Sequence, residues 1–273
     1  MKNIVFTGGG TLGHVMPNLY LMDELKDWKI SYIGSNGIEK ERLRGKVNFY
    51  EIPSVKLDRS KFFSNFKIPF VLVSAINQSK KILSEIKPDV LFSKGGYVSL
   101  PVCIAASKLK IPIITHESDY SFGLANRLIL KFCNAMCVNF KNLENSNKKC
   151  IYTGPIFSKQ FENKQNKFVS AKLDSNKKTI LIIGGSLGSR TINENIYKIL
   201  PKLLEEFNVI HITGKGNNNV KPYKNYISME MTDDIVSLYN IADFVIGRSG
   251  AGVTAECFYK NIPRRKGGKA VPK

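Results

Sequence analysis

One pattern occurs twice in this chain: a short run of apolar residues that leads directly into a glycine-rich turn. Residues 4–7 precede Gly9-Gly10-Thr11-Leu12-Gly13, and residues 180–183 precede Gly184-Gly185-Ser186-Leu187-Gly188. Each copy predicts a buried strand, a tight turn and the first turn of a helix, where glycine lets backbone N–H groups approach an anion. Two copies predict two similar α/β domains facing a cleft that holds a phosphorylated substrate.

The length and composition suit a globular protein with room for two domains. At 273 residues, two domains of about 130 residues could each bury a core. No stretch holds the roughly 18 consecutive apolar residues of a membrane-spanning helix, and residues 1–7 begin in a strand pattern without the layout of a signal peptide. These features predict a protein that stays in the cytosol.

Charge and metal-binding residue types narrow the range of partners. The 41 Lys and Arg against 22 Asp and Glu give a net charge of +19, which favours polyanions or an anionic membrane surface. Nucleic acid is disfavoured, because the basic residues are spread along the chain and no nucleic-acid-binding motif occurs. The five cysteines lack C-x-x-C spacing and the three histidines are scattered, so we expect no metal site and no cofactor.

Apolar runs alternate with helical stretches in two blocks, as parallel sheets with crossover helices require. The first predicted domain is residues 1–157, with strands at 4–7, 30–34, 89–93, 111–115 and 135–138. Residues 158–178 are polar and predict a linker. The second domain, residues 179–273, has predicted strands at 179–183, 209–213 and 244–247 and a helix at 191–207. Its basic end, 264–273, lacks apolar periodicity, so we expect this doubly wound domain to be incomplete.

His14 is the first candidate for chemistry. It follows the first glycine turn at the predicted start of a helix, where the helix dipole opposes protonation and favours a neutral imidazole. A neutral imidazole can act as a general base. The alternative is a structural histidine that orders the turn.

Two more glycine turns follow predicted strands. Residues 93–99, Ser-Lys-Gly-Gly-Tyr-Val-Ser, form either an anion site beside the first turn or a tight turn that binds nothing. Residues 248–252 lead into Glu256, whose carboxylate either accepts hydrogen bonds from a ribose diol or lies solvated on the surface. Neither turn distinguishes these alternatives by its spacing.

Residues 61–83 interleave aromatic and aliphatic side chains with lysines. This pattern is typical of an apolar patch with a basic rim that rests on an anionic membrane. It also fits a helix that packs into the core. The residues alone favour the core helix slightly.

Several of these segments, taken in order, resemble the MurG family of UDP-N-acetylglucosamine transferases, which convert lipid I to lipid II in peptidoglycan synthesis. The resemblance runs from Met1 to about Pro263. It rests on residues 9–14, 95–99, 116–117, 123–126, 184–190, 233–234 and 248–256. A chance match of so many motifs in the family's order is improbable.

The resemblance implies a GT-B fold, with two Rossmann-like domains facing a cleft, in a peripheral protein at the cytoplasmic face of the bacterial cell membrane. It implies metal-independent, inverting transfer of N-acetylglucosamine from UDP-N-acetylglucosamine to the C4 hydroxyl of lipid I, undecaprenyl-pyrophosphoryl-N-acetylmuramyl-pentapeptide. His14 would be the base. The acceptor pyrophosphate would face Gly10, Gly95, Gly96 and Tyr97. The donor would contact Thr11, Leu12, Gly13, Asp119, Ser186, Thr232, Ala251, Gly252, Val253, Thr254, Ala255 and Glu256.

The chain departs from the family pattern at three places. Ser118-Asp119 stands where the family usually has Gln-Asn, so a sugar-contacting amide becomes a carboxylate. No arginine follows Gly154-Pro155, and the glutamine-rich segment expected after Pro263 is absent. Two alternatives therefore stay open. One is an inactive relative that binds lipid-linked pyrophosphate or a membrane partner, and the other is a glycosyltransferase with a different lipid-linked acceptor.

Overall fold

The chain folds into two compact units, Met1–Ile156 (unit 1) and Phe157–Lys273 (unit 2), each built on its own parallel sheet. The computed structural model describes residues 1–54, 68–157, 169, 172–185, 188–217, 222–232, 234–248, 250–262 and 264–266. Within these ranges, no helix combines the length and the apolar character needed to cross a membrane.

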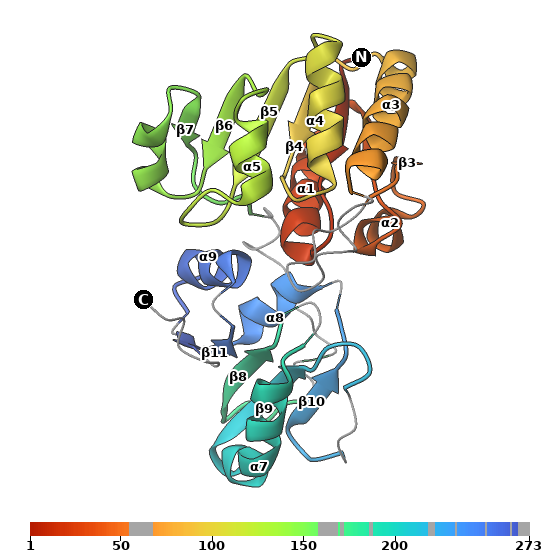
Figure 1. Cartoon of the computed structure of the whole chain (residues 1–273). Helices are drawn as coiled ribbons and strands as arrows, with labels where there is room; N and C mark the ends of the chain where they lie inside the picture. The colour runs from red at the N-terminus through yellow and green to blue at the C-terminus, as the bar shows by residue number, and fades with distance from the viewer. Residues whose placement is uncertain are drawn as a thin grey trace. The chain divides into compact units, whose positions relative to one another are not determined.

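Unit 1 is a seven-stranded parallel sheet with the order β3-β2-β1-β4-β5-β6-β7 (Figure 1). Its strands are β1 (Asn3–Thr7), β2 (Lys29–Gly34), β3 (Asn48–Glu51), β4 (Val90–Ser93), β5 (Ile113–Glu117), β6 (Ala135–Val138) and β7 (Cys150–Tyr152). Its helices are α1 (Leu12–Glu24), α2 (Ile38–Leu43), α3 (Ile68–Ile86), α4 (Ser99–Lys108), α5 (Leu124–Ile129) and the 3₁₀ helix η2 (Lys141–Ser146). The strand order reverses between β1 and β4, and ligands of such sheets bind beyond the carboxyl ends of the strands at this point.

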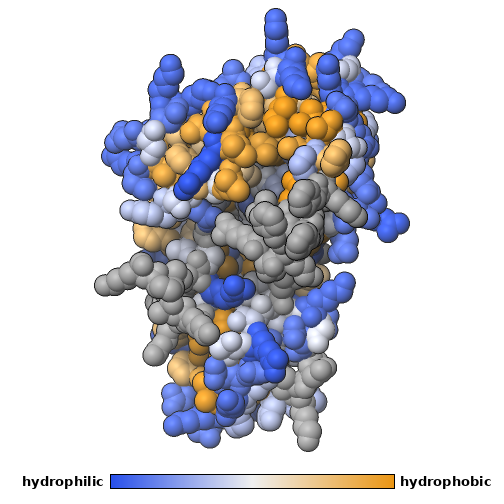
Figure 2. Space-filling view, viewed as in Figure 1, coloured by the Kyte–Doolittle hydropathy of each residue, from blue (hydrophilic) through white to orange (hydrophobic). Residues whose placement is uncertain are grey.

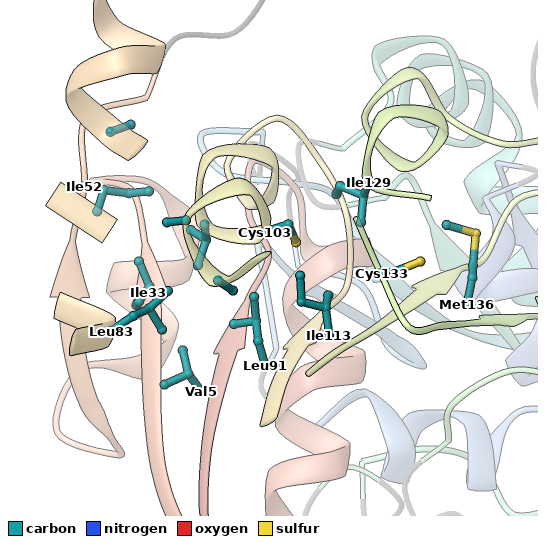
Figure 3. Packing of buried hydrophobic residues seen from close by; sticks show 14 of the residues in the cluster. Val5, Ile33, Ile52, Leu83, Leu91, Cys103, Ile113, Ile129, Cys133 and Met136 are labelled. Atoms are coloured by element: carbon teal, nitrogen blue, oxygen red, sulfur yellow. The ribbon is translucent and has the colours of Figure 1, made fainter. Parts of the chain in front are cut away.

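The core of unit 1 has two halves, one on each face of the sheet. Val5 and Leu91 lie fully buried on one face against Val102 of α4, in the cluster that Figure 3 shows. Phe6 packs on the other face with Tyr32, beside partly buried residues of α1. Because each large apolar side chain stabilises the fold by about 1.5–3 kcal/mol when buried, this packing fixes the strands that carry the glycine turns.

Unit 2 repeats the architecture on a five-stranded parallel sheet with the order β10-β9-β8-β11-β12. Its strands are β8 (Lys178–Ile183), β9 (Phe207–Ile212), β10 (Tyr226–Met229), β11 (Phe244–Gly247) and β12 (Arg264–Lys266). Its helices are α7 (Arg190–Glu206), α8 (Ile235–Ile241) and α9 (Ala251–Tyr259). Alternate residues of β8 face opposite cores, since Leu181 belongs to one buried cluster and Ile182 to the other.

Four strands were absent from the sequence-based expectation. The short strands β3, β7 and β10 are partly polar and lie at sheet edges, so alternation gives little signal for them. Strand β12 falls in the basic end and pairs with β11, Val245 opposite Arg264, so backbone hydrogen bonding and not apolar periodicity defines it. Strand β5 begins two residues later than expected, at Ile113, and continues to Glu117 opposite Val138.

Candidate functional site

In chain order, the first glycine turn, residues 9–13, and the second, residues 93–99, lie side by side at the carboxyl edge of the sheet of unit 1. Strands β1 and β4 pair in parallel, Thr7 opposite Ser93, and each runs directly into its turn. Gly10 has a φ of +83°, a conformation that only glycine adopts readily. The Tyr97 ring covers Gly10 so closely that an added Cβ there would lie 2.6 Å from Tyr97 Cε1. Expected acceptor residues from both turns therefore share one small region.

The second turn also reaches His14. Gly95 and Gly96 have φ values of +87° and +86°, so both need glycine. An added Cβ on Gly96 would lie 3.0 Å from the Gly9 carbonyl oxygen and 3.4 Å from His14 Nδ1. The absence of a side chain at Gly96 thus leaves room for the His14 ring.

His14 occupies the first turn of α1, and its side chain is half-buried. Nδ1 lies 3.0 Å from the Thr11 hydroxyl oxygen, and the Gly9 carbonyl raises the pKa of the ring in part. Burial lowers the pKa of His14 to about 4, and the nearby Lys94 ammonium adds to the shift. Burial is therefore the main cause of the low pKa, and the imidazole is neutral at pH 7. A neutral ring can accept a proton.

The residues that flank His14 leave the start of α1 open. Thr11 and Gly13 are exposed, whereas Leu12 is half-buried. An added Cβ on Gly13 would meet only the Thr11 hydroxyl, at 3.7 Å. Their expected contact with the donor sugar remains a prediction.

Asp119 lies just beyond β5, at the same sheet edge as the two turns. The Glu117 carboxylate accepts hydrogen bonds from the backbone amides of Asp119 and Gly123, both at 2.9 Å, and so shapes this loop. The pKa of the exposed Asp119 carboxyl is raised by partial burial and by Glu117, whereas Lys94 lowers it. Within the described ranges, no group of three or more His, Cys, Asp or Glu side chains is suited to a metal ion.

The third glycine turn is the counterpart of the first in unit 2. Gly185 and Gly188 have φ values of +88° and +75°, and the Gly188 amide donates to the Gly185 carbonyl at 3.0 Å. Helix α7 begins just after the turn, at Arg190. Ser186, an expected donor contact, lies outside the described residues.

The fourth turn opens helix α9, which begins at Ala251 after Gly250. Gly252 and Thr254 are exposed, Val253 and Ala255 are half-buried, and the Thr254 hydroxyl donates to the Gly250 carbonyl at 2.8 Å. Residues 252–255 therefore lie exposed or half-exposed in the first turns of the helix.

Glu256 follows in α9 and is half-buried, so it is not the solvated surface residue of the alternative reading. Burial raises the pKa of its carboxyl, and a hydrogen bond with the Tyr239 side chain lowers it in part. Thr232, the expected neighbour of the uracil, lies beyond the carboxyl end of β10, and its hydroxyl accepts a hydrogen bond from the Asp234 amide at 3.0 Å. Thr232 therefore lies at the carboxyl edge of the sheet of unit 2, where α9 also begins after β11.

Comparisons with known proteins identify the family. The glycosyltransferase family 28 N-terminal domain matches residues 4–138, and the glycosyltransferase family 28 C-terminal domain matches residues 179–264. A relative from Clostridium perfringens, strain SM101, is 45% identical over 271 residues, which cover 93% of this chain and 74% of that protein. It is named UDP-N-acetylglucosamine–N-acetylmuramyl-(pentapeptide) pyrophosphoryl-undecaprenol N-acetylglucosamine transferase. The chain belongs to the MurG family of glycosyltransferases.

Solved structures confirm the GT-B fold expected for a MurG-family chain. MurG from Acinetobacter baumannii superposes with a TM-score of 0.65 at 23% identity, covering 94% of this chain and 76% of that one. The glycosyltransferase of kitacinnamycin reaches a TM-score of 0.73 at 13% identity, covering 99% and 81%. At these identities the likeness concerns the fold alone.

Two residues of this MurG-family site were missed by the sequence reasoning. Lys94 is 1% exposed, and its Nζ donates to the Ser118 hydroxyl at 2.5 Å. Burial lowers the pKa of Lys94 to about 8, while Glu117 and Asp119 oppose that shift. Its position inside the second glycine turn was an available signal. The other residue, Glu39, lies in α2 and carries no local motif, so only the packing reveals it.

Proposed function

We propose that this chain transfers N-acetylglucosamine from UDP-N-acetylglucosamine to the C4 hydroxyl of lipid I, with inversion at the anomeric carbon, to give lipid II. The neutral His14 imidazole beside the two glycine turns of unit 1 is the observation that carries the proposal. The Clostridium relative, whose name states this transfer, supports the choice of substrates.

The reaction needs one proton acceptor and a means of stabilising the leaving group. As the C4 oxygen of the acceptor attacks C1 of the donor sugar, His14 takes the hydroxyl proton and the bond from C1 to the UDP oxygen breaks. UDP departs with added negative charge. Backbone N–H groups at the start of α7 and of α9 would stabilise that charge without a metal.

The acceptor pyrophosphate is assigned to Gly95, Gly96 and Tyr97, with the Lys94 ammonium close behind the turn. The donor is assigned to unit 2, with Thr232 near the uracil and residues 251–256 near the diphosphate and ribose. Glu256 would accept hydrogen bonds from the ribose hydroxyls. The half-buried position of its carboxylate strengthens such bonds relative to those of a solvated one.

Replacing Glu256 by glutamine is expected to weaken donor binding about tenfold, because the charged acceptor of the ribose diol is lost. Isothermal titration with UDP-N-acetylglucosamine measures the change. Glu206→Gln, an exposed site at the end of α7, is the matched control and should bind as the wild type does. Equal affinity in the Glu256 variant and the wild type would remove Glu256 from the donor site.

An anionic membrane surface is the proposed location of the acceptor, and α3 is the proposed contact. Phe70 and Val73 are 80% and 57% exposed on this helix, and Lys80 and Lys81 are exposed on it as well. Figure 2 shows hydrophobic side chains gathered on the face of unit 1 that carries α3 and α4. Residues 61–67 of the expected patch lie outside the described residues. One face of α3 packs into the core of unit 1 through Ala75, Ile82 and Leu83, as the core interpretation expected. The exposed apolar residues beside lysines on the same helix support a membrane contact in addition.

The double variant Phe70→Ser, Val73→Ser should bind vesicles containing phosphatidylglycerol at least about tenfold more weakly, since two apolar side chains no longer enter the membrane. Vesicle co-sedimentation measures the loss. Phe258→Ser changes an equally exposed aromatic residue on α9 and serves as the control. If the control loses as much binding as the double variant, α3 is not the specific contact.

Transfer of labelled sugar to a lipid I analogue tests the proposed function directly. Calorimetry distinguishes the alternatives. An inactive relative would bind the acceptor but release no heat with UDP-N-acetylglucosamine, whereas an enzyme with another acceptor would bind the donor but not the lipid I analogue.

A further inference from the structure

Glu39 is a fully buried carboxylate that the proposed reaction does not use. It lies in the first turn of α2 with 0% exposure. Oε1 accepts hydrogen bonds from the Ser35 amide at 2.9 Å and from the Ser35 hydroxyl at 2.5 Å, and Oε2 accepts one from the Gly10 amide at 3.2 Å. No Lys, Arg or His in the described ranges forms an ion pair with it. Burying a charge costs several kcal/mol. Since no ion pair compensates for this cost in the described ranges, the neutral hydrogen-bond donors must do so.

The Glu39 carboxylate lies directly against the first glycine turn. An added Cβ on Gly9 would collide with both carboxylate oxygens, so Gly9 makes room for Glu39. Tyr32 anchors the same turn, because its hydroxyl donates to the Gly8 carbonyl at 2.6 Å. Two buried side chains therefore hold the backbone of residues 8–10.

The backbone that Glu39 and Tyr32 hold lies next to His14. Gly9, which touches Glu39, also borders the His14 ring: an added Cβ on Gly96 would lie 3.0 Å from the Gly9 carbonyl oxygen and 3.4 Å from His14 Nδ1, and this carbonyl raises the pKa of His14 in part. The same ring faces the charges of Lys94, Glu117 and Glu39. A shift of the Gly9–Gly10 backbone would move both the carbonyl beside the imidazole and the start of α1.

We infer that Glu39 is a positioning residue for His14. On this inference the first glycine turn holds the base in place and does not bind the acceptor pyrophosphate. The inference rests on the proposed function. The Gly10 amide, expected to face the acceptor pyrophosphate, already donates to Glu39. A phosphate at that amide would also meet the negative charge of the carboxylate. The neighbouring turn at Gly95 and Gly96 is left to bind the pyrophosphate.

Glu39→Gln tests this role with a side chain of nearly the same shape. Its single amide oxygen cannot accept from both Gly10 and Ser35, so the turn should loosen. We expect kcat to fall roughly 10- to 100-fold, as for a base displaced by about 1 Å, with both KM values within about threefold of the wild type. ¹⁵N NMR of the imidazole at pH 7 should show one dominant His14 tautomer in the wild type and a mixture in the variant.

Glu51→Gln is the matched control, because Glu51 is an exposed carboxylate nearby in unit 1, paired with Lys40 at 2.7 Å. It should leave kcat and the His14 spectrum unchanged. If Glu39→Gln does not fold, Ser35→Ala replaces it, since it removes one donor to Glu39 and should shift both readouts in the same direction by less. Wild-type kcat and a wild-type His14 spectrum in the folded variant would overturn the inference. The NMR result stands even if the wild type transfers no sugar, so a failure of the proposed function is recognised separately.

Discussion

Replacing His14 by glutamine should lower kcat by about 10²–10⁴-fold while both KM values change little. The reason is that glutamine keeps a polar side chain at the start of α1 but cannot accept the proton of the acceptor hydroxyl. Steady-state kinetics with UDP-N-acetylglucosamine and a lipid I analogue measure this result. A variant with wild-type kcat would show that His14 only orders the turn.

His116→Gln provides the contrasting control. His116 is 1% exposed, and its Nε2 lies 3.3 Å from the Gly154 carbonyl oxygen, so its ring supports the fold. This variant should unfold at a lower temperature than the wild type but keep kcat within a few-fold when folded. Similar losses of kcat in both variants would mean that His14 has no special place in the chemistry.

The pH dependence follows from the same shift of the His14 pKa. Because burial lowers that pKa from 6.5 to about 4, the base form is present throughout the range from pH 8 to about 5.5, and kcat should not fall there through His14. Burial of the neutral ring also stabilises the fold above pH 6.5, and this contribution is lost as the pH falls towards 4. A midpoint of kcat near pH 6.5 would contradict a half-buried base with a lowered pKa.

The largest expected loss of stability comes from Gly188→Ala. Gly188 has a φ of +75°, and an added Cβ would collide with the Thr213 carbonyl oxygen, which is backbone and cannot rotate away. Strain and overlap together should lower the free energy of unfolding by about 2–5 kcal/mol. Urea unfolding measures the loss.

Gly216→Ala separates the two causes. Gly216 has nearly the same φ, +76°, but no atom would lie within 4 Å of an added Cβ. Only the backbone strain remains, so the expected loss is about 1 kcal/mol. Equal losses of unfolding free energy in the two variants would show that the overlap with Thr213 does not contribute to the destabilisation.

Strong local patterns made much of the fold predictable. The apolar runs before Gly9 and Gly184 gave β1 and β8, because a buried parallel strand is a continuous apolar segment and a glycine turn ends it. Strand β12 has no such pattern. It is a strand because it pairs with β11, and its own three residues do not indicate that pairing.

The candidate site was predictable only where a motif is local. His14 and the residues of the glycine turns follow directly from the sequence. Glu39 is hydrogen-bonded to Gly10, 29 positions away, and the Lys94 ammonium to Ser118, 24 positions away. Neither contact can be recognised from the local sequence. The burial that lowers the His14 pKa could not be predicted for the same reason, since burial is a property of the packed unit.

The central claim is that this chain transfers N-acetylglucosamine to lipid I with His14 as the base. The most direct measurement is the incubation of the folded chain with radiolabelled UDP-N-acetylglucosamine and a soluble lipid I analogue, with the anomeric linkage of the product read by NMR. We expect a β-linked disaccharide product from the α-linked donor, and almost none with His14→Gln. Absence of transfer by a wild-type chain that binds both substrates in calorimetry would contradict the claim.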